Sequence, residues 1–213
     1  MKTRFGLLLI VFTLFATGCA TVKQQSVTLS SDAISSKSGR IGVAMTALPK
    51  VDTQFPGADC LLCLAAASIA NASLTNYTHT LTSEDLPKLK SQVANLLQKK
   101  GMEVLVIEEN LNVGSFPDFG TKGTNVALKN FTPLKQKYNI DKLLVIDING
   151  LGFIRTYASY IPTSDPKGII RGAGYIINLS NNTYDWYLPL EVMKSADSVW
   201  DEPPKFPGLT NAY

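Results

Sequence analysis

The sequence has few of the residues that carry enzyme chemistry. Its 213 residues include three cysteines and a single histidine, His79. A tetrahedral zinc site needs four ligands, most often Cys and His, so this supply does not favour one. No Gly-x-Ser-x-Gly frame of a hydrolase is present, and the pair Gly150 and Gly152 lacks the third glycine of a dinucleotide-binding loop. The sequence therefore predicts no cofactor, no metal and no enzymatic activity.

An excess of charge of one sign is also missing. Lys and Arg number 20 and Asp and Glu 17, and Lys2 and Arg4 lie in an amino-terminal segment that holds no acidic residue. Without that segment the chain carries 18 basic residues against 17 acidic ones and is nearly neutral. Nucleic acid is bound through clustered Lys and Arg that neutralise phosphates. The sequence therefore predicts no nucleic-acid partner.

A long apolar run occurs only at the amino terminus. Residues 6–15 are ten residues, too short to cross a bilayer comfortably as a permanent helix. They follow Lys2 and Arg4 and precede the small residues 16–18, which is the order of a signal peptide. A plain secretory peptide cut after residue 18, with Cys19 left as an ordinary thiol, is the alternative interpretation.

The stretch Ala16-Thr17-Gly18-Cys19 resembles the lipobox of bacterial lipoproteins. It matches at Thr17, Gly18 and Cys19 and departs at Ala16, where Leu is commoner. The resemblance implies cleavage before Cys19, lipidation of that cysteine (palmitate among the acyl chains) and, because Ala20 is not Asp, an outer-membrane anchor facing the periplasm. Each buried methylene contributes about 0.8 kcal/mol, so two or three chains hold the protein stably at the membrane.

The chain divides into four segments. Residues 1–18 are the predicted signal peptide, and residues 19–39 are the lipidated cysteine and a flexible tether rich in Ser, Thr, Lys and Gln. Residues 40–195 are the predicted globular domain. Residues 196–213 are a proline-rich extended tail that ends like a helix just begun, so we expect that it docks on something or that the natural protein continues.

The apolar pattern of residues 40–195 predicts a single-domain α/β (α+β) sandwich, with a mixed sheet, about three helices on one face and a carboxy-terminal antiparallel meander. Cys60 to Tyr77 is rich in Ala and Leu and is expected to be a largely buried helix. Other helices are expected at 86–100, ended by Gly101, and around 126–138. Strands are expected at 41–45, 102–107, 142–148, 153–161, 169–179 and 183–190.

Residues 143–152 (LLVIDINGLG) stand before the meander. Together with the lipobox and the tether, this run resembles envelope α/β modules such as the curli secretion-channel subunit and the amino-terminal domain of the TolB translocation protein. The resemblance implies a similar element order from Arg40 to Leu190. It assigns no functional residue.

Cys60 and Cys63 form a Cys-x-x-Cys pair at the start of a predicted helix. An exported chain meets an oxidising compartment, which favours a structural disulfide. Two unpaired buried thiols are a second interpretation, because Cys packs like a small hydrophobic residue. A thiol-disulfide redox pair is a third, since a helix amino terminus stabilises a thiolate.

The meander is rich in aromatic residues, and Tyr, Trp and Arg dominate protein interfaces. The interface candidates are Tyr157, Tyr160, Trp186, Arg155 and Arg171. Ordinary cross-strand packing within the sheet is the alternative role for such residues.

These observations favour a membrane-anchored, non-enzymatic accessory or assembly subunit that binds another envelope protein. One alternative is a subunit of a homo-oligomeric secretion channel, and a second is a redox protein that uses Cys60 and Cys63. The sequence does not identify the partner or the oligomeric state.

Overall fold

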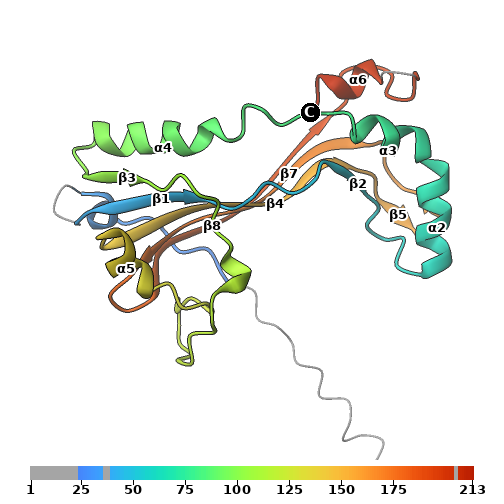
Figure 1. Cartoon of the computed structure of the whole chain (residues 1–213). Coiled ribbons are helices and arrows are strands. Elements are labelled where there is room, and N and C mark those ends of the chain that lie inside the picture. Colours follow the sequence, from blue (N-terminus) through green and yellow to red (C-terminus); the bar gives the residue numbers. More distant parts are fainter. Residues whose placement is uncertain (1–23, 36–38, 204–205) are drawn as a thin grey trace, which may run out of the picture.

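The protein was analysed as a computed structural model, which describes residues 24–35, 39–203 and 206–213. Its centre is a six-stranded mixed sheet in the order β3-β1-β4-β7-β8, with β2 beside β4 farther along that strand (Figure 1). The β1 strand runs parallel to β3 and β4, whereas β4, β7 and β8 are antiparallel neighbours. The strands are β1 (Ile41–Met45), β2 (Asp52–Gln54), β3 (Val104–Val106), β4 (Lys142–Ile154), β7 (Lys167–Asn178) and β8 (Thr183–Ser195).

Helices surround this sheet and confirm the predicted α/β class. Helix α4 covers one face and α5 the other, while α2 and α3 lie at one end (Figure 1). The helices are η1 (Ser31–Ile34), α2 (Leu61–Ala70), α3 (Ala72–Thr78), α4 (Lys88–Lys99), η2 (Val113–Ser115), α5 (Pro133–Tyr138) and α6 (Pro207–Thr210). A small hairpin, β5 (Tyr157–Ala158) and β6 (Ile161–Pro162), lies apart from the main sheet. Among the described residues, no helix combines the length and apolar character needed to cross a membrane.

Strand β4 is the centre of the core. Successive side chains of a strand point to opposite faces, so Leu143 and Val145 pack with Phe131 and Tyr175 on one face. Leu144 packs on the other face with residues of β1 and α4. The predicted burial of residues 142–148 on both faces is confirmed, and it explains why their apolar run shows no alternation.

Strand β4 also continues past residue 148, where we expected the strand to end. At Gly150 the register shifts against β7, which is a β-bulge inside one strand rather than a boundary between two. Gly152 has φ +128, and a Cβ there would lie 2.1 Å from the Asp52 carbonyl oxygen. Glycine is therefore required for β2 to lie against β4.

The described part of the expected tether, residues 24–35, is held against the domain. Val27 donates its N–H to the Tyr187 carbonyl at 2.8 Å and accepts the Tyr187 N–H at 3.1 Å. Ala33 is buried, and its carbonyl accepts a hydrogen bond from Lys142 Nζ at 3.3 Å. This segment docks because the start of β8 offers an unpaired edge that Val27 completes. Cys19 and the signal peptide lie outside the described residues.

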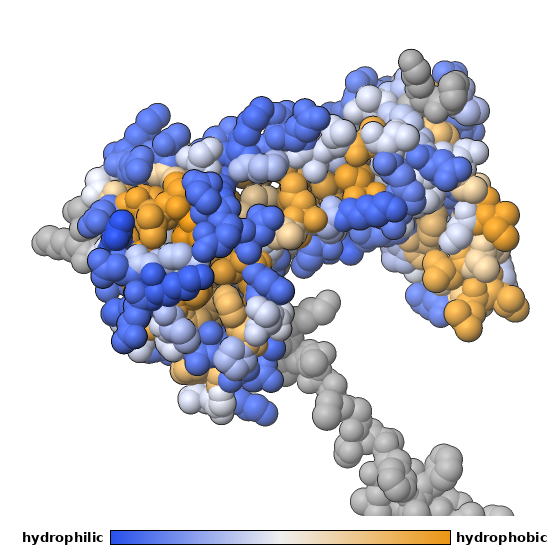
Figure 2. All heavy atoms as spheres, viewed as in Figure 1, coloured by the Kyte–Doolittle hydropathy of each residue, from blue (hydrophilic) through white to orange (hydrophobic). Residues whose placement is uncertain are grey.

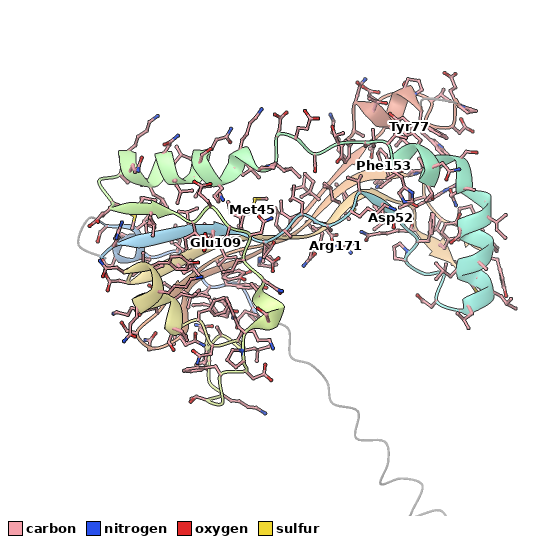
Figure 3. All side chains as sticks on the ribbon, viewed as in Figure 1. Met45, Asp52, Tyr77, Glu109, Phe153 and Arg171 are labelled. Carbon is pink, nitrogen blue, oxygen red and sulfur yellow. A yellow bond between two sulfur atoms is a disulfide. The ribbon has the colours of Figure 1, made fainter. Side chains whose placement is uncertain are left out.

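The tail docks on the domain's own core. Phe206 and Leu209 are buried with Leu74 and Phe153. The Tyr77 ring lies 5.4 Å from the Phe206 ring. Figure 3 labels Tyr77 and Phe153 near one another at this end of the molecule. The last residues thus close the end of the sheet that α2 and α3 approach.

Lys142 is the one nearly buried cation of the core among the described residues, and its ammonium lies 2.7 Å from Asp185 Oδ2. We predict that Asp185→Ala lowers the free energy of unfolding by about 3 kcal/mol, because a nearly buried charge loses its partner. The double variant Lys142→Met/Asp185→Leu should lose less, since it leaves no unpaired charge. Urea unfolding measures both, and the exposed pair of Lys88 and Asp85 is the control, where Asp85→Ala should change little. Equal stability of Asp185→Ala and the parent would contradict this role.

Candidate functional site

Two of the five interface candidates face inward. Tyr157 is buried, and its hydroxyl accepts a hydrogen bond from Asn71 Nδ2 at 2.6 Å. Arg155 donates to Asn71 Oδ1 at 2.9 Å, and its guanidinium lies 4.7 Å from the Trp200 ring centroid. These residues join the α2–α3 junction and the tail to the end of β4. They are part of the internal packing of this end of the domain.

The other three candidates are separated on the surface. Arg171, labelled in Figure 3, is 2.9 Å from Glu191 Oε2 and 3.1 Å from Gln54 Oε1. Trp186 is partly buried over Gly174. Tyr160 is 54% exposed, with its hydroxyl 3.7 Å from Cys60 Sγ. The five residues therefore do not form one continuous surface.

The other tyrosines of the meander, Tyr175, Tyr184 and Tyr187, pack against one another. The ring centroids of Tyr175 and Tyr187 are 5.8 Å apart, and those of Tyr184 and Tyr187 are 5.1 Å apart. Burial, with the charges of Tyr187 and Asp147 adding to it, raises the pKa of Tyr184 to about 12. Burial also raises the pKa of the Asp147 carboxyl, although the Thr46 hydroxyl, 3.1 Å away, lowers it. The cluster supports the fold and offers no reactive phenol near neutral pH.

The raised pKa of Asp147 predicts how the stability of the folded protein depends on pH. The folded state favours the protonated form of this carboxyl. The stabilisation from protonation is therefore present at low pH and is lost as pH rises through the pKa of the folded state. We predict that Asp147→Asn, which keeps an acceptor for Thr46, raises the melting temperature at pH 7. At pH 3 the variant and the parent should melt nearly together. Thermal melts at both pH values test this, and a variant less stable than the parent at pH 7 would contradict it.

A disulfide joins Cys60 and Cys63. Cys60 is the N-cap residue of α2, and its Sγ accepts the Cys63 N–H at 2.9 Å. Ser159 Oγ lies 3.2 Å from Cys63 Sγ, which links the bond to the β5–β6 hairpin. The pair is therefore bonded rather than two unpaired thiols, and the bond closes the first turn of α2.

His79 belongs to the surface. Its Nε2 atom is 2.9 Å from Asp52 Oδ1, and both side chains are exposed in part. Among the described residues, no group of three or more His, Cys, Asp or Glu side chains is placed to hold a metal ion.

The expected burial of the first helix is wrong for α2. Leu61 is 88% exposed, Leu62 72% and Ile69 78%, and only Cys63 and Ala67 of this helix are buried. Figure 2 shows hydrophobic residues gathered at this end of the molecule. The helix protrudes because the neighbouring core is small: among the described residues, Cys63 and Ala67 share a hydrophobic cluster with Phe55, Ala58 and Tyr157. A helix that is apolar all round does not show from its periodicity which side is covered.

A second exposed apolar surface lies on the last half of β8. The first half of this edge strand is covered, by Asn125–Val126 beside Tyr184 and by Val27 beside Tyr187. From residue 188 to residue 195 every side chain is exposed, and no further strand pairs with this edge among the described residues. Leu188, Leu190 and Val192 share one face and are 46%, 39% and 50% exposed. We call residues 188–195 the open edge.

The backbone groups of the open edge follow from the pairing of Tyr187. Since Tyr187 directs its N–H and C=O away from β7, the residues at 189, 191, 193 and 195 do the same. Pro189 has no N–H to offer, which an edge strand tolerates. Glu191, Met193 and Ser195 therefore present outward N–H groups. The edge has the hydrogen-bonding pattern that another strand requires.

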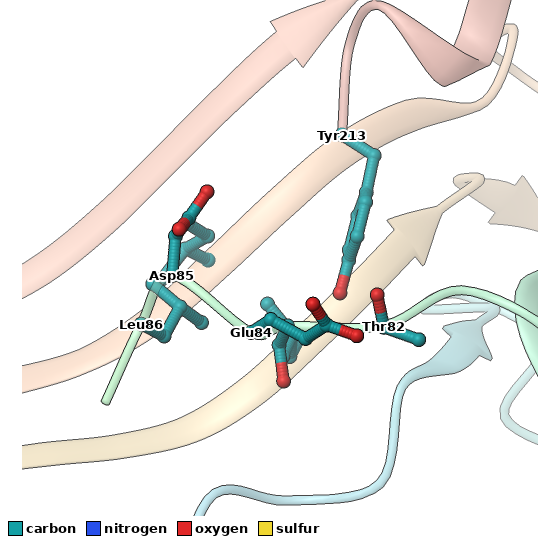
Figure 4. Close-up of a pocket in the computed structure, with 8 residues that line it drawn as sticks. Thr82, Glu84, Asp85, Leu86 and Tyr213 are labelled. Carbon is teal, nitrogen blue, oxygen red and sulfur yellow. The ribbon is translucent and has the colours of Figure 1, made fainter. Parts of the chain in front are cut away.

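A pocket of about 360 Å³ lies beside the open edge (Figure 4). The segment 82–86 forms one wall, and Leu151 and Ile170 form its floor. The hydroxyl of Tyr213 points into it and has no hydrogen-bond partner among the described residues. Ile170 pairs across the sheet with Val192, so the apolar floor continues to the open edge.

Sequence reasoning missed both surfaces, although each leaves a signal. The alternating apolar residues Leu188, Leu190 and Val192 extend the strand past residue 190, where we ended it. The stretch 60–83 contains no Asp, Glu, Lys or Arg, which is unusual for a surface helix.

No family model and no curated protein matches the chain. Among solved structures it is similar to lipoprotein GNA1162 from Neisseria meningitidis, at 12% identity over 75% of this chain and 83% of that one, with a TM-score of 0.33. It is similar to PelC from Paraburkholderia phytofirmans, a dodecamer, at 9% identity over 80% of each chain and a TM-score of 0.29. Protein XCC0632 from Xanthomonas campestris shares 13% identity over 84% and 81% of the chains, with a TM-score of 0.30. Likenesses this weak carry no argument about function.

Proposed function

We propose that this protein is a lipid-anchored subunit of the cell envelope that binds another envelope protein and has no catalytic activity of its own. The lipobox resemblance at residues 16–19 supports the anchor and the compartment. The observation that carries the binding function is the open edge of β8. It combines outward backbone donors and acceptors with an exposed apolar row.

The binding mode that fits this edge is strand addition. An extended segment of the partner would pair with the outward backbone groups of Glu191 and Met193, which supply affinity. Its alternate side chains would lie over Leu190 and Val192 and reach toward the pocket, which supplies specificity. The partner is thus a protein with an extended segment that is apolar at every second residue.

The two edges of the sheet differ in a way that supports this choice. A free edge is a liability in a monomeric protein, and edges are commonly kept short or covered. The opposite edge strand, β3, is only three residues long, and the start of β8 is covered by the chain itself. The open edge is long and apolar, while Pro189, Glu191 and Lys194 restrict unspecific pairing.

Site-specific photo-crosslinking in intact cells tests this proposal. A photoreactive residue at Val192 should give a crosslink to one other envelope protein, and the same residue at Gln92 on α4 should not. Adding Glu191→Pro, which removes one outward N–H, should lower the crosslink yield at Val192 by about tenfold or more, since the added strand loses its register. Glu191→Ala is the matched control, because it removes the same carboxylate and keeps the N–H.

Three outcomes would overturn the proposal. A crosslink that survives Glu191→Pro would exclude strand addition. A product at twice the subunit mass would show that a second copy occupies the edge, as a homo-oligomeric channel subunit requires. The absence of any crosslink at Val192 would leave the edge without a protein partner.

A further inference from the structure

We infer that α2 is a second membrane contact of this protein, which inserts into the headgroup region of the bilayer that holds the lipid anchor. Of the proposed function, this inference uses only the lipid anchor. We call the exposed apolar residues of α2 and the adjoining hairpin the α2 surface. Its central members are Leu61, Leu62, Ala65, Ile69, Tyr160 and Ile161.

The extent of exposure around α2 fits a continuous medium better than a protein partner. At about 100° per residue, the exposed positions of this helix cover about 240° of its circumference. A helix that packs on one partner needs an apolar stripe little wider than about 100°. A bilayer interface surrounds an inserted helix and so covers the wider arc.

The size of α2 also argues against a second copy as its occupant. Ten residues make a helix about 15 Å long and about 10 Å wide, so packing one face buries a few hundred Å². Stable protein interfaces bury about 1,200 Å² or more. The α2 surface alone is too small for such an interface, whereas a lipid-anchored protein needs only a small additional contact.

The charge of the region suits insertion. Residues 60–83 hold no Asp, Glu, Lys or Arg, and His79 is their one titratable side chain apart from the disulfide-bonded cysteines and Tyr77. A charged residue in the apolar part of a bilayer costs several kcal/mol. Asp59 precedes the helix and can stay at the headgroup level, because the exposed arc is centred on Ala65 and Ile69, away from it.

Several backbone groups at both ends of α2 have partners within the chain, which lowers the cost of a lipid contact. At the start, Cys63 donates its N–H to Cys60 Sγ, and Leu64 donates to the Cys60 carbonyl at 2.8 Å. At the end, the Ala67 carbonyl accepts from both the N–H and the side-chain amide of Asn71. The disulfide adds a covalent link at the first turn of the helix.

The β5–β6 hairpin extends the same surface. Tyr160 lies beside Cys60, and the next residue, Ile161, is also exposed. Tyrosine is favoured at membrane interfaces, where its ring meets apolar groups and its hydroxyl meets water.

The position of the anchor agrees with this orientation. Gln24, where the described chain begins, is five positions after Cys19, and five extended residues span at most about 18 Å. Gln24 lies by Asn125, in the loop on the α5 side of the sheet. In Figure 1, α2 extends toward this side of the sheet, away from α4. A bilayer on that side is within reach of both Cys19 and α2.

Quenching of tryptophan by brominated lipid tests the inference on the mature, lipidated full chain. The protein is reconstituted into vesicles of phosphatidylethanolamine and phosphatidylglycerol, with or without dibrominated phosphatidylcholine. Leu62→Trp and Ile69→Trp each add a probe at an exposed position, so the fold should persist. Gln92→Trp on α4 is the matched control. The parent, with Trp186 and Trp200, supplies the background that is subtracted.

The added emission of Leu62→Trp and Ile69→Trp should fall by about twofold or more in brominated vesicles, because inserted helices lie about 5–10 Å into the interface. The added emission of Gln92→Trp should not change. If the protein floats with the vesicles but neither α2 probe is quenched, the inference is overturned, while the proposed lipid anchor is still supported. Unquenched emission that shifts to the blue as protein concentration rises would identify a second copy on α2 and would also overturn it. A parent that does not float would remove the anchor, and the inference would fall with it.

Discussion

The ladder formed by β4, β7 and β8 is longer than the layers available to cover it, and much of the structure follows from this mismatch. Strand β4 is 13 residues long, whereas β1 has five and β3 has three. Strands β1 and β3 and helix α4 therefore cover only the first half of the ladder. Its second half is assembled from smaller pieces: β2, α3 and the docked tail.

The smaller pieces close the second half incompletely. Gly152 lets β2 reach β4, and Leu74, Phe206 and Leu209 bury Phe153. No described segment covers the outer edge of β8 after Tyr187. Helix α2 rests on this end through two small side chains and a disulfide. Both exposed apolar surfaces thus lie at the end of the sheet that the other elements cover incompletely. We propose that two external partners, a protein strand and a bilayer, cover these surfaces.

The sequence predicted the half of the fold that has a conventional core. Residues 142–148 were identified as a central strand because both faces are apolar, and Gly101 marked the end of α4 because its φ of +82 suits a residue after a helix. The helix expected around residues 126–138 spans only Pro133–Tyr138 in the structure. The Asn182 side chain forms hydrogen bonds with the backbone of Ala127, Lys129 and Phe131 and holds that segment extended.

The candidate surfaces were harder to predict, for physical reasons. A run such as residues 61–70 has the same composition whether it is buried in a core or exposed to a partner. The sequence shows that the residues are apolar but not what packs against them. The meander aromatics were selected for residue type, yet Tyr157 and Arg155 turned out to be internal through their hydrogen bonds to Asn71. Such contacts join residues more than 80 positions apart and leave no local pattern.

The central claim is that the open edge is free in the isolated subunit and paired in the envelope. Amide hydrogen exchange of Glu191, Met193 and Ser195 measures this directly, because exchange reports whether each outward N–H is hydrogen-bonded. The account predicts fast exchange in the purified protein and at least about tenfold slower exchange in native membranes, with Leu190 and Val192 protected in both, since their N–H groups point to β7. Equal, fast exchange of the outward amides in both states would contradict it.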